Sequence, residues 1–177
     1  MKIILIGIQG AGKSTQGNLL SEKLKLPYLS TGHIFRDLAK EKNPEGRYIK
    51  ETINAGYLLP DEKTLDVVSG YLLRPEYKDG YILDGFPRTT IQANAFKENI
   101  DFVFYLKVSD KEALWRISGR DDERDDETLK AIRKRIELFH EVTLPVLDYY
   151  KEKGVFVEIN GEQSIEDINK EILSKIS

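Results

Sequence analysis

Short aliphatic and β-branched runs alternate along the chain with longer stretches in which apolar residues recur at helical spacing. The short runs are nearly continuous in apolar residues, as in parallel strands covered on both faces. They lie at residues 2–7, 28–30, 81–84, 102–108 and 155–160. The helical stretches lie at 13–24, 34–42, 47–54, 61–73, 90–99 and 110–118. Strands that alternate with helices predict an α/β fold with a parallel sheet.

Two local signals refine these helices. Ser109 and Glu112 have the spacing of a capping box, which predicts that a helix begins at residue 110. A long helical pattern spans residues 126–153 and contains Pro145. Because proline lacks an N–H and clashes with the preceding turn, we expect the helix to bend or break there.

Length and composition indicate a globular protein. The chain has 177 residues, of which 40% are hydrophobic and 32% charged, with six prolines and thirteen glycines. This size suits one compact domain, with room for small appendages. We therefore predict a single domain over residues 1–177.

Charge and cysteine content exclude several classes of function. The chain contains no cysteine, so disulfides, thiolate zinc sites and thiol catalysis are excluded. The apolar run at the N-terminus is too short for a signal peptide or a membrane span, and we expect a cytoplasmic protein. With a net charge of −3, no global basic field would attract nucleic acid, so local arginines must hold any anionic ligand.

A phosphate-binding motif follows the first predicted strand. The sequence GIQGAGKS at residues 7–14 matches G-x-x-x-x-G-K-[ST] and precedes a predicted helix. Its glycines let the backbone wrap phosphates closely, and the helix adds its positive dipole end. We expect Lys13 to bridge the β- and γ-phosphates of a bound nucleotide, and the hydroxyl of Ser14 or Thr15 to face Mg²⁺.

A carboxylate ends the third predicted strand. Asp84 lies at the sheet's carboxyl edge, where open α/β sheets bind their ligands. We expect it to hold Mg²⁺ through water.

Further motifs carry a resemblance to a known family. The segment DGFPR at 84–88, followed by Gln92, resembles the signature of adenylate kinases and related nucleoside-monophosphate kinases. The segment LSTG at 29–32 with Arg36 resembles their monophosphate-binding segment, and RKR at 133–135 their late arginine motif. The resemblance covers essentially the whole chain.

The resemblance implies a fold and an activity. The fold is that of P-loop NTPases, with a five-stranded parallel sheet of order 2-3-1-4-5 flanked by helices. A monophosphate-binding helical segment is expected at about 30–60 and a short lid loop at about 120–126. The activity is reversible, Mg²⁺-dependent phosphoryl transfer from ATP to AMP, giving two ADP.

The resemblance also implies site residues. Catalytic roles fall to Lys13, Arg88, Arg120, Arg124 and Arg135. ATP-binding residues are Gly10, Ala11, Gly12, Lys13, Ser14, Thr15, Arg116, Arg120 and Gln163. AMP-binding residues are Thr31, Gly32, Arg36, Gly56, Leu58, Leu59, Gly85, Arg88, Gln92, Arg124 and Arg135. Ser14 and Asp84 are the expected Mg²⁺ residues, partly through water.

This chain departs from the family pattern at three places. Only three residues separate Arg120 from Arg124, so the chain resembles the short-lid type, in which closure is a loop motion. Ser14 stands where many members have glycine, which leaves the chemistry intact. His33 stands where the family has an acidic residue near the metal's water shell, which would weaken Mg²⁺ organisation or make it pH-dependent. An equal alternative for His33 is a helix-entry residue with no special task.

Two other functions remain open at this stage. A uridylate or cytidylate kinase, or one of broad specificity, would share the phosphate-handling residues and differ in base contacts, for which Thr31 and Gln92 are the discriminators. A nucleotide-binding switch protein would not require Arg36 and Arg88. No nucleic acid, membrane or obligate protein partner is expected.

Overall fold

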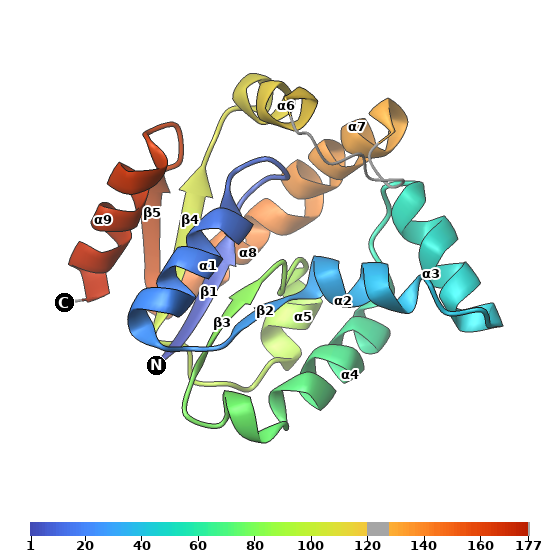
Figure 1. Ribbon diagram of the computed structural model, residues 1–177, viewed down its shortest axis with the longest axis horizontal. Helices are drawn as coiled ribbons and strands as arrows, with labels where there is room; N and C mark the ends of the chain where they lie inside the picture. The colour runs from blue at the N-terminus through green and yellow to red at the C-terminus, as the bar shows by residue number, and fades with distance from the viewer. Residues whose placement is uncertain (120–127, 177) are drawn as a thin grey trace.

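The computed structural model describes residues 1–119 and 128–176, and its centre is a five-stranded parallel sheet (Figure 1). The strands are β1 (Lys2–Ile6), β2 (Tyr28–Ser30), β3 (Tyr81–Asp84), β4 (Phe102–Lys107) and β5 (Phe156–Asn160). Their order is β2-β3-β1-β4-β5, with parallel pairing throughout. The predicted α/β class and strand order are therefore confirmed.

The register of the sheet brings three loops together. Asp84 pairs with Leu5 of β1 on one side and with Ser30 of β2 on the other. The segments that follow β1, β2 and β3 therefore leave the sheet side by side at its carboxyl edge. These are the segments that carry the three sequence motifs described above.

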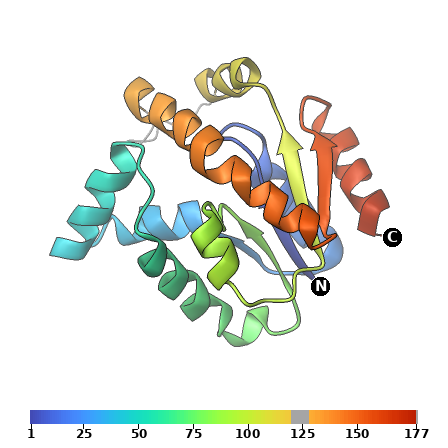
Figure 2. The ribbon, with the colours of Figure 1, turned by 180° about the vertical axis from the view of Figure 1, so that it is seen from behind.

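Helices cover both faces of the sheet, which accounts for the apolar strands. The helices α1 (Lys13–Leu24) and α9 (Ile165–Ile176) pack together on one face (Figure 1). The other face carries α8 (Leu144–Glu152) and α5 (Thr90–Ala95), with α4 (Asp61–Leu72) beyond α5 (Figure 2). The core consists largely of strand residues, among them Ile4, Leu83 and Phe104, each with no exposed surface.

The two helices after β2 begin earlier than predicted. Helix α2 spans Thr31–Leu38 instead of 34–42, because the Ser30 side chain caps it by accepting the His33 N–H. Helix α3 spans Pro44–Asn54 instead of 47–54. Asn43 caps it, and Pro44 occupies the first turn, where a proline costs no hydrogen bond.

Helix α5 is shorter than predicted, ending at Ala95 instead of residue 99. Phe96 adopts an extended conformation with ψ of 99° and is 7% exposed. Its ring packs edge-on against Phe86 at a centroid distance of 5.0 Å. Burial of this side chain in the core ends the helix where local pattern would continue it.

The long helix near the C-terminus continues past Pro145 without a break. Its described part consists of α7 (Leu129–Leu138), a π-helical turn (Phe139–Thr143) and α8. Pro145 lies in the first turn of α8, directly after the π-helical turn, which ends with the Leu144 N–H donating to the Phe139 carbonyl oxygen. The expected disturbance is thus a local change of helical pitch.

Helix α6 (Asp110–Ser118) begins where the capping signal predicted, with the Ser109 side chain accepting the Glu112 N–H at 3.3 Å. In a capping box the Ser109 N–H would be donated to the Glu112 side chain. Here it is donated to Glu162 Oε1 instead, at 2.8 Å. A 3₁₀ turn at Pro75–Tyr77 completes the described elements. Among the helices described, none has the length and apolar character needed to cross a membrane.

Candidate active site

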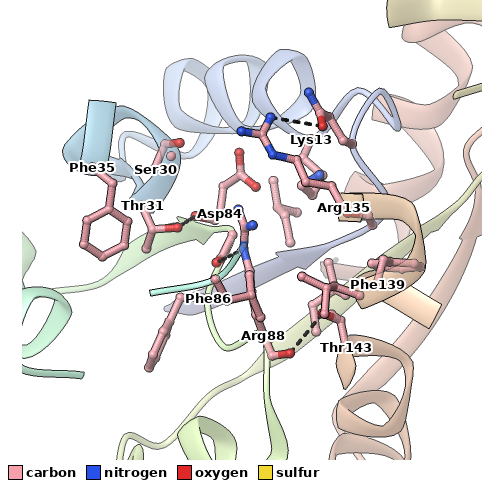
Figure 3. A pocket seen from close by; sticks show the side chains of 18 of the residues that line it. Lys13, Ser30, Thr31, Phe35, Asp84, Phe86, Arg88, Arg135, Phe139 and Thr143 are labelled. Carbon is pink, nitrogen blue, oxygen red and sulfur yellow. Dashed lines mark hydrogen bonds between the residues drawn. The ribbon is translucent and has the colours of Figure 1, made fainter. Parts of the chain in front are cut away.

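A cavity of about 320 Å³ opens at the carboxyl edge of the sheet. Figure 3 shows Lys13, Asp84, Arg88 and Arg135 around it, contributed by segments far apart in the sequence. Most of the residues expected to bind nucleotide or metal line it: Gly10, Gly12, Lys13, Ser14, Thr15, Thr31, Gly32, Arg36, Gly56, Leu58, Leu59, Asp84, Gly85, Arg88, Gln92 and Arg135. Its volume is that of a small-molecule site.

The loop between β1 and α1 has the backbone that a phosphate cradle requires. Gly10 has φ of +90°, and a Cβ there would lie 2.7 Å from the carbonyl oxygen of Ala113, so only glycine fits. Lys13 donates from Nζ to the carbonyl oxygens of Gly7 at 2.8 Å and Ile8 at 3.1 Å. Ala11, also expected to bind ATP, is fully buried, is not among the residues that line the cavity, and donates its N–H to the Ile8 carbonyl oxygen at 3.0 Å. The lysine is thereby held against the loop at the N-terminus of α1.

Asp84, itself buried, is the centre of a hydroxyl–carboxylate cluster next to this loop. Its Oδ2 accepts hydrogen bonds from Tyr28 Oη at 2.7 Å and from Ser14 Oγ at 3.3 Å, and the residue is 4% exposed. Burial, and then the charge of Asp84, raise the pKa of Tyr28, so the phenol stays a neutral donor. Hydroxyl and carboxylate oxygens are hard ligands, and this pair fits an Mg²⁺ ion that takes its remaining ligands from water and phosphate.

Three arginines supply positive charge to the same cavity. Arg88 donates from Nε to the Gly85 carbonyl oxygen at 2.8 Å. Burial, with the nearby charges of Arg135 and Arg36, lowers the pKa of the Arg88 guanidinium from its ordinary value. Like charges are held together here at a cost that a bound polyanion would offset.

Arg135 reaches the cavity from α7. Its two terminal nitrogens donate to Gln9 Oε1 at 3.2 Å and to the Ile53 carbonyl oxygen at 2.8 Å. The guanidinium therefore spans the phosphate loop on one side and the end of α3 on the other.

The cavity also contains the residues expected to contact a base. Thr31 donates its hydroxyl to the Asp84 carbonyl oxygen at 3.2 Å. Gln92 is 2% exposed, and its Oε1 accepts the Arg88 N–H at 2.7 Å. Both polar side chains are thus held in place by main-chain groups, beside the apolar Leu58 and Leu59.

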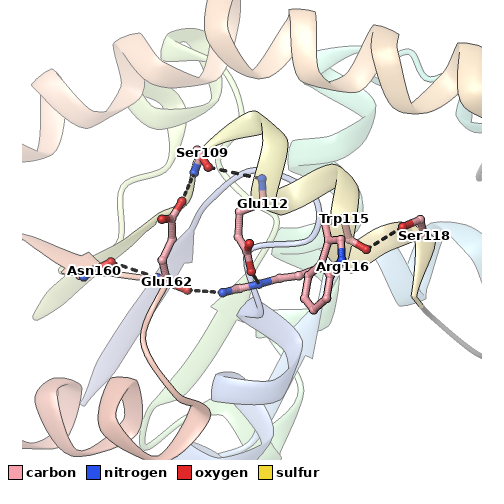
Figure 4. A network of polar contacts seen from close by, with 8 residues as sticks. Ser109, Glu112, Trp115, Arg116, Ser118, Asn160 and Glu162 are labelled. Carbon is pink, nitrogen blue, oxygen red and sulfur yellow. Dashed lines mark hydrogen bonds and ion pairs between the residues drawn. The ribbon is translucent and has the colours of Figure 1, made fainter.

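A second polar network lies outside this cavity, between α6 and the loop after β5 (Figure 4). Arg116 donates from Nε to Glu112 Oε1 at 2.7 Å and from a terminal nitrogen to the Gly161 carbonyl oxygen at 2.9 Å. Gln163 donates to the Asn160 carbonyl oxygen at 3.0 Å and to Glu171 Oε2 at 2.7 Å. The structure thus brings Arg116 to the loop that contains Gln163.

Comparison with known proteins identifies the family. A family model described as adenylate kinase matches residues 5–155. The chain is 36% identical to an adenylate kinase of Clostridium botulinum, over 95% of this chain and 94% of that protein. It is 34% identical to an adenylate kinase of Acetivibrio thermocellus, over 100% of this chain and 98% of that protein. It is also 34% identical to an adenylate kinase of Caldicellulosiruptor bescii, over 99% of each chain. The chain belongs to the adenylate kinase family.

This adenylate kinase family member is shorter than those relatives. The alignment with the Acetivibrio thermocellus protein runs over 213 positions, against 177 residues here, so at least 36 positions fall opposite gaps in this chain. The expected lid arginines Arg120 and Arg124 lie outside the described residues.

Several residues that shape the site carried no signal in the sequence. In the sequence, Tyr28 is recognisable only as a strand residue. In the structure its ring packs against Gly17, where an added Cβ would lie 2.3 Å from the nearest ring carbon. Thr143, in the π-helical turn, donates its hydroxyl to the Arg88 carbonyl oxygen at 2.9 Å. The contacts of Tyr28 with Asp84 and of Thr143 with Arg88 join distant segments, so no local pattern could predict them. His33, which the sequence singles out, lies near Tyr28, with ring centroids 6.4 Å apart.

Proposed function

We propose that this member of the adenylate kinase family transfers the terminal phosphoryl group of ATP to AMP, reversibly giving two ADP, in the cavity at the carboxyl edge of the sheet. One observation carries the proposal: the phosphate-loop lysine and three arginines line a single cavity. The lysine and its loop already serve the phosphates of one nucleotide. The added arginines suit a second phosphate-bearing substrate.

The donor triphosphate lies along the phosphate loop. Main-chain N–H groups of Gly10 and Gly12 contact its phosphates, as does that of Ala11 once it leaves the Ile8 carbonyl oxygen, and α1 adds its dipole. Lys13 leaves the carbonyl oxygens of Gly7 and Ile8 for the β- and γ-phosphates. Ser14 and Thr15 complete this side of the site, with their hydroxyls near the triphosphate.

Ser14 and Asp84 hold Mg²⁺ that arrives with ATP, partly through water. When bound, the ion neutralises charge on the β- and γ-phosphates. Among the described residues no cluster of three or more metal-ligating side chains occurs, which suits an ion carried by the substrate. Tyr28 orients the Asp84 carboxylate by its hydrogen bond.

Arg36 and Arg88 hold the α-phosphate of AMP, and Arg135 stabilises the transferring group. Charge spreads over the equatorial oxygens during transfer, so several converging cations are the expected catalytic equipment. The acceptor is a phosphate that is largely ionised near neutral pH, so the reaction needs no general base. We assign the same clamping function to Arg120 and Arg124.

The two bases occupy different places. Thr31 and Gln92 bind the adenine of AMP, with Gly32, Gly56, Leu58, Leu59 and Gly85 along the nucleoside. Arg116 and Gln163 flank the adenine of ATP, and the network around Arg116 supports this placement. The side chain of Glu112 keeps the guanidinium plane in position.

We assign the whole chain, residues 1–177, to one domain with a monophosphate-binding segment at about 30–60 and a short lid at about 120–126. At least 36 positions of the alignment with the Acetivibrio thermocellus protein have no counterpart in this chain, as the loss of a long lid would require. A cytoplasmic location suits the substrates and the lack of cysteine. Nucleotides are the only partners that the proposal requires.

A panel of nucleoside monophosphates tests this function. ADP formation is measured with saturating ATP and Mg²⁺ and with AMP, UMP, CMP, GMP or no acceptor. We expect kcat/KM for AMP to exceed the values for UMP and CMP by roughly 10²–10⁴, because a pyrimidine cannot pair with the hydrogen-bonding capacity that Thr31 and Gln92 keep for a ligand. Equal rates with AMP and UMP would contradict the base assignment alone. ADP formation at the same rate with and without an acceptor would contradict the proposed kinase activity.

A further inference from the structure

Asp61, the first residue of α4, is bonded to the side chain expected to recognise AMP. Its Oδ1 accepts hydrogen bonds from Gln92 Nε2 at 2.9 Å and from Thr89 Oγ1 at 2.8 Å. The Thr89 hydroxyl in turn accepts the Gln92 N–H at 3.0 Å. Asp61 is therefore tied to Gln92 both directly and through Thr89.

These contacts determine which way the Gln92 amide faces. Its oxygen accepts the Arg88 N–H, and its nitrogen donates to the Asp61 carboxylate. A main-chain N–H can only donate and a carboxylate can only accept. Turning the amide over would therefore set donor against donor and acceptor against acceptor. Because Gln92 is 2% exposed, water could not repair either loss.

The pinned amide retains one N–H and one oxygen lone pair for a ligand, and it lines the cavity. Adenine presents an amino donor beside a ring acceptor. Guanine presents a carbonyl acceptor beside a ring N–H, which is the reverse order. With the phosphate end of the ligand anchored by arginines, the base cannot turn over to compensate. An amide of fixed orientation can therefore match one purine only.

We propose that Asp61 is the positioning residue that makes this site select a 6-aminopurine over a 6-oxopurine monophosphate. It acts by fixing the orientation of the Gln92 amide. The inference rests on the proposed function, because it takes the cavity to be the acceptor site. It assigns to Asp61 no contact with substrate.

The test compares kcat/KM for AMP and GMP in wild type, Asp61→Asn and Asp66→Asn. The asparagine can present either its oxygen or its amide N–H to Gln92, so only the Arg88 N–H still opposes turning the Gln92 amide over. We expect the AMP-to-GMP ratio to fall about tenfold or more in Asp61→Asn, chiefly through a higher KM for AMP. Asp66 is exposed on the same helix, and Asp66→Asn should keep the wild-type ratio. Should thermal melting show that Asp61→Asn does not fold, Asp61→Ser carries the same comparison.

A second pair separates orientation from general damage to the fold. In a Gln92→Ala background, adding Asp61→Asn should leave the AMP-to-GMP ratio unchanged, because the amide through which Asp61 acts is gone. A further drop in that background, or an equal loss for AMP and GMP in the single variant, would overturn the inference. If the wild-type protein forms ADP from AMP and Asp61→Asn keeps the wild-type AMP-to-GMP ratio, the inference is refuted and the proposed function stands. Wild-type protein without AMP-dependent ADP formation refutes the proposed function and the inference together.

Discussion

At the scale of single residues, the cations of the site are oriented by main-chain carbonyl groups. Lys13 contacts Gly7 and Ile8, Arg88 contacts Gly85, and Arg135 contacts Ile53. A neutral carbonyl holds a cation in place without cancelling its charge. The positive charge therefore remains available to phosphate, in a cavity where electrostatic interactions are stronger than in water.

Lys13→Ala should lower kcat more than it weakens ATP binding. The lysine charge matters most as the bond between the β- and γ-phosphates breaks. We expect a loss of about 10²–10³ in kcat, the scale of one preorganised electrostatic contact. Steady-state kinetics, with thermal melting to verify the fold, measures this. A folded variant with wild-type kcat would remove the phosphate loop from the mechanism.

Tyr28→Phe should raise the Mg²⁺ concentration that gives half-maximal activity. The variant loses the 2.7 Å hydrogen bond that orients the Asp84 carboxylate. Loss of such an outer-shell contact typically costs about 10–100-fold in metal affinity or activity. Tyr48→Phe, at a residue 47% exposed, is the matched control. An Mg²⁺ titration curve identical to wild type would show that Tyr28 has no part in metal binding.

At the scale of elements, the site depends on how helices end or change pitch. The π-helical turn at Phe139–Thr143 places Thr143 against the Arg88 carbonyl oxygen, and Ser109 starts α6 so that Arg116 meets the loop after β5. Departures from regular helix therefore occur where side chains must reach the site. Such π-helical turns are frequent at functional sites.

Thr143→Val should destabilise the protein by about 1–3 kcal/mol, because the Arg88 carbonyl oxygen loses its partner in a site where Thr143 is 6% exposed. The KM for AMP should rise as well, since Arg88 is less well held. Thr143→Ser keeps the hydroxyl and should restore the KM. Urea unfolding and AMP titrations measure the two effects. If the valine variant matched the serine variant in both, the hydrogen bond would have no role in positioning Arg88.

At the scale of the whole molecule, the cavity joins segments far apart in the chain, from the end of β1 to the π-helical turn. A ligand there contacts the folded protein only, because unfolding separates these segments. Binding and stability are therefore linked.

Saturating nucleotide should raise the melting temperature. At a ligand concentration 100 times Kd, stabilisation is about 2.7 kcal/mol. For a domain of this size that corresponds to roughly 5–11 °C. Differential scanning calorimetry with ATP and Mg²⁺ measures the shift, and Lys13→Ala should show a smaller one. Adenosine without phosphate should give little shift, and an equal shift with adenosine would contradict phosphate recognition.

The sequence by itself determined the local features: the strands, the phosphate loop, the start of α6 and the residues of the recognition motifs. These follow from short-range periodicity, capping and backbone conformation, which adjacent residues decide. The resemblance to a family supplied the strand order, which no periodicity contains.

Only the tertiary structure decided the contacts between distant segments. Asp61 with Gln92, Tyr28 with Asp84 and Thr143 with Arg88 are separated by 31, 56 and 55 residues. It also ended α5 at Ala95, because Phe96 gains more from burial than from another helical turn. Each of these outcomes depends on which surfaces meet when the helices pack on the sheet, and a pattern along the chain does not carry that information.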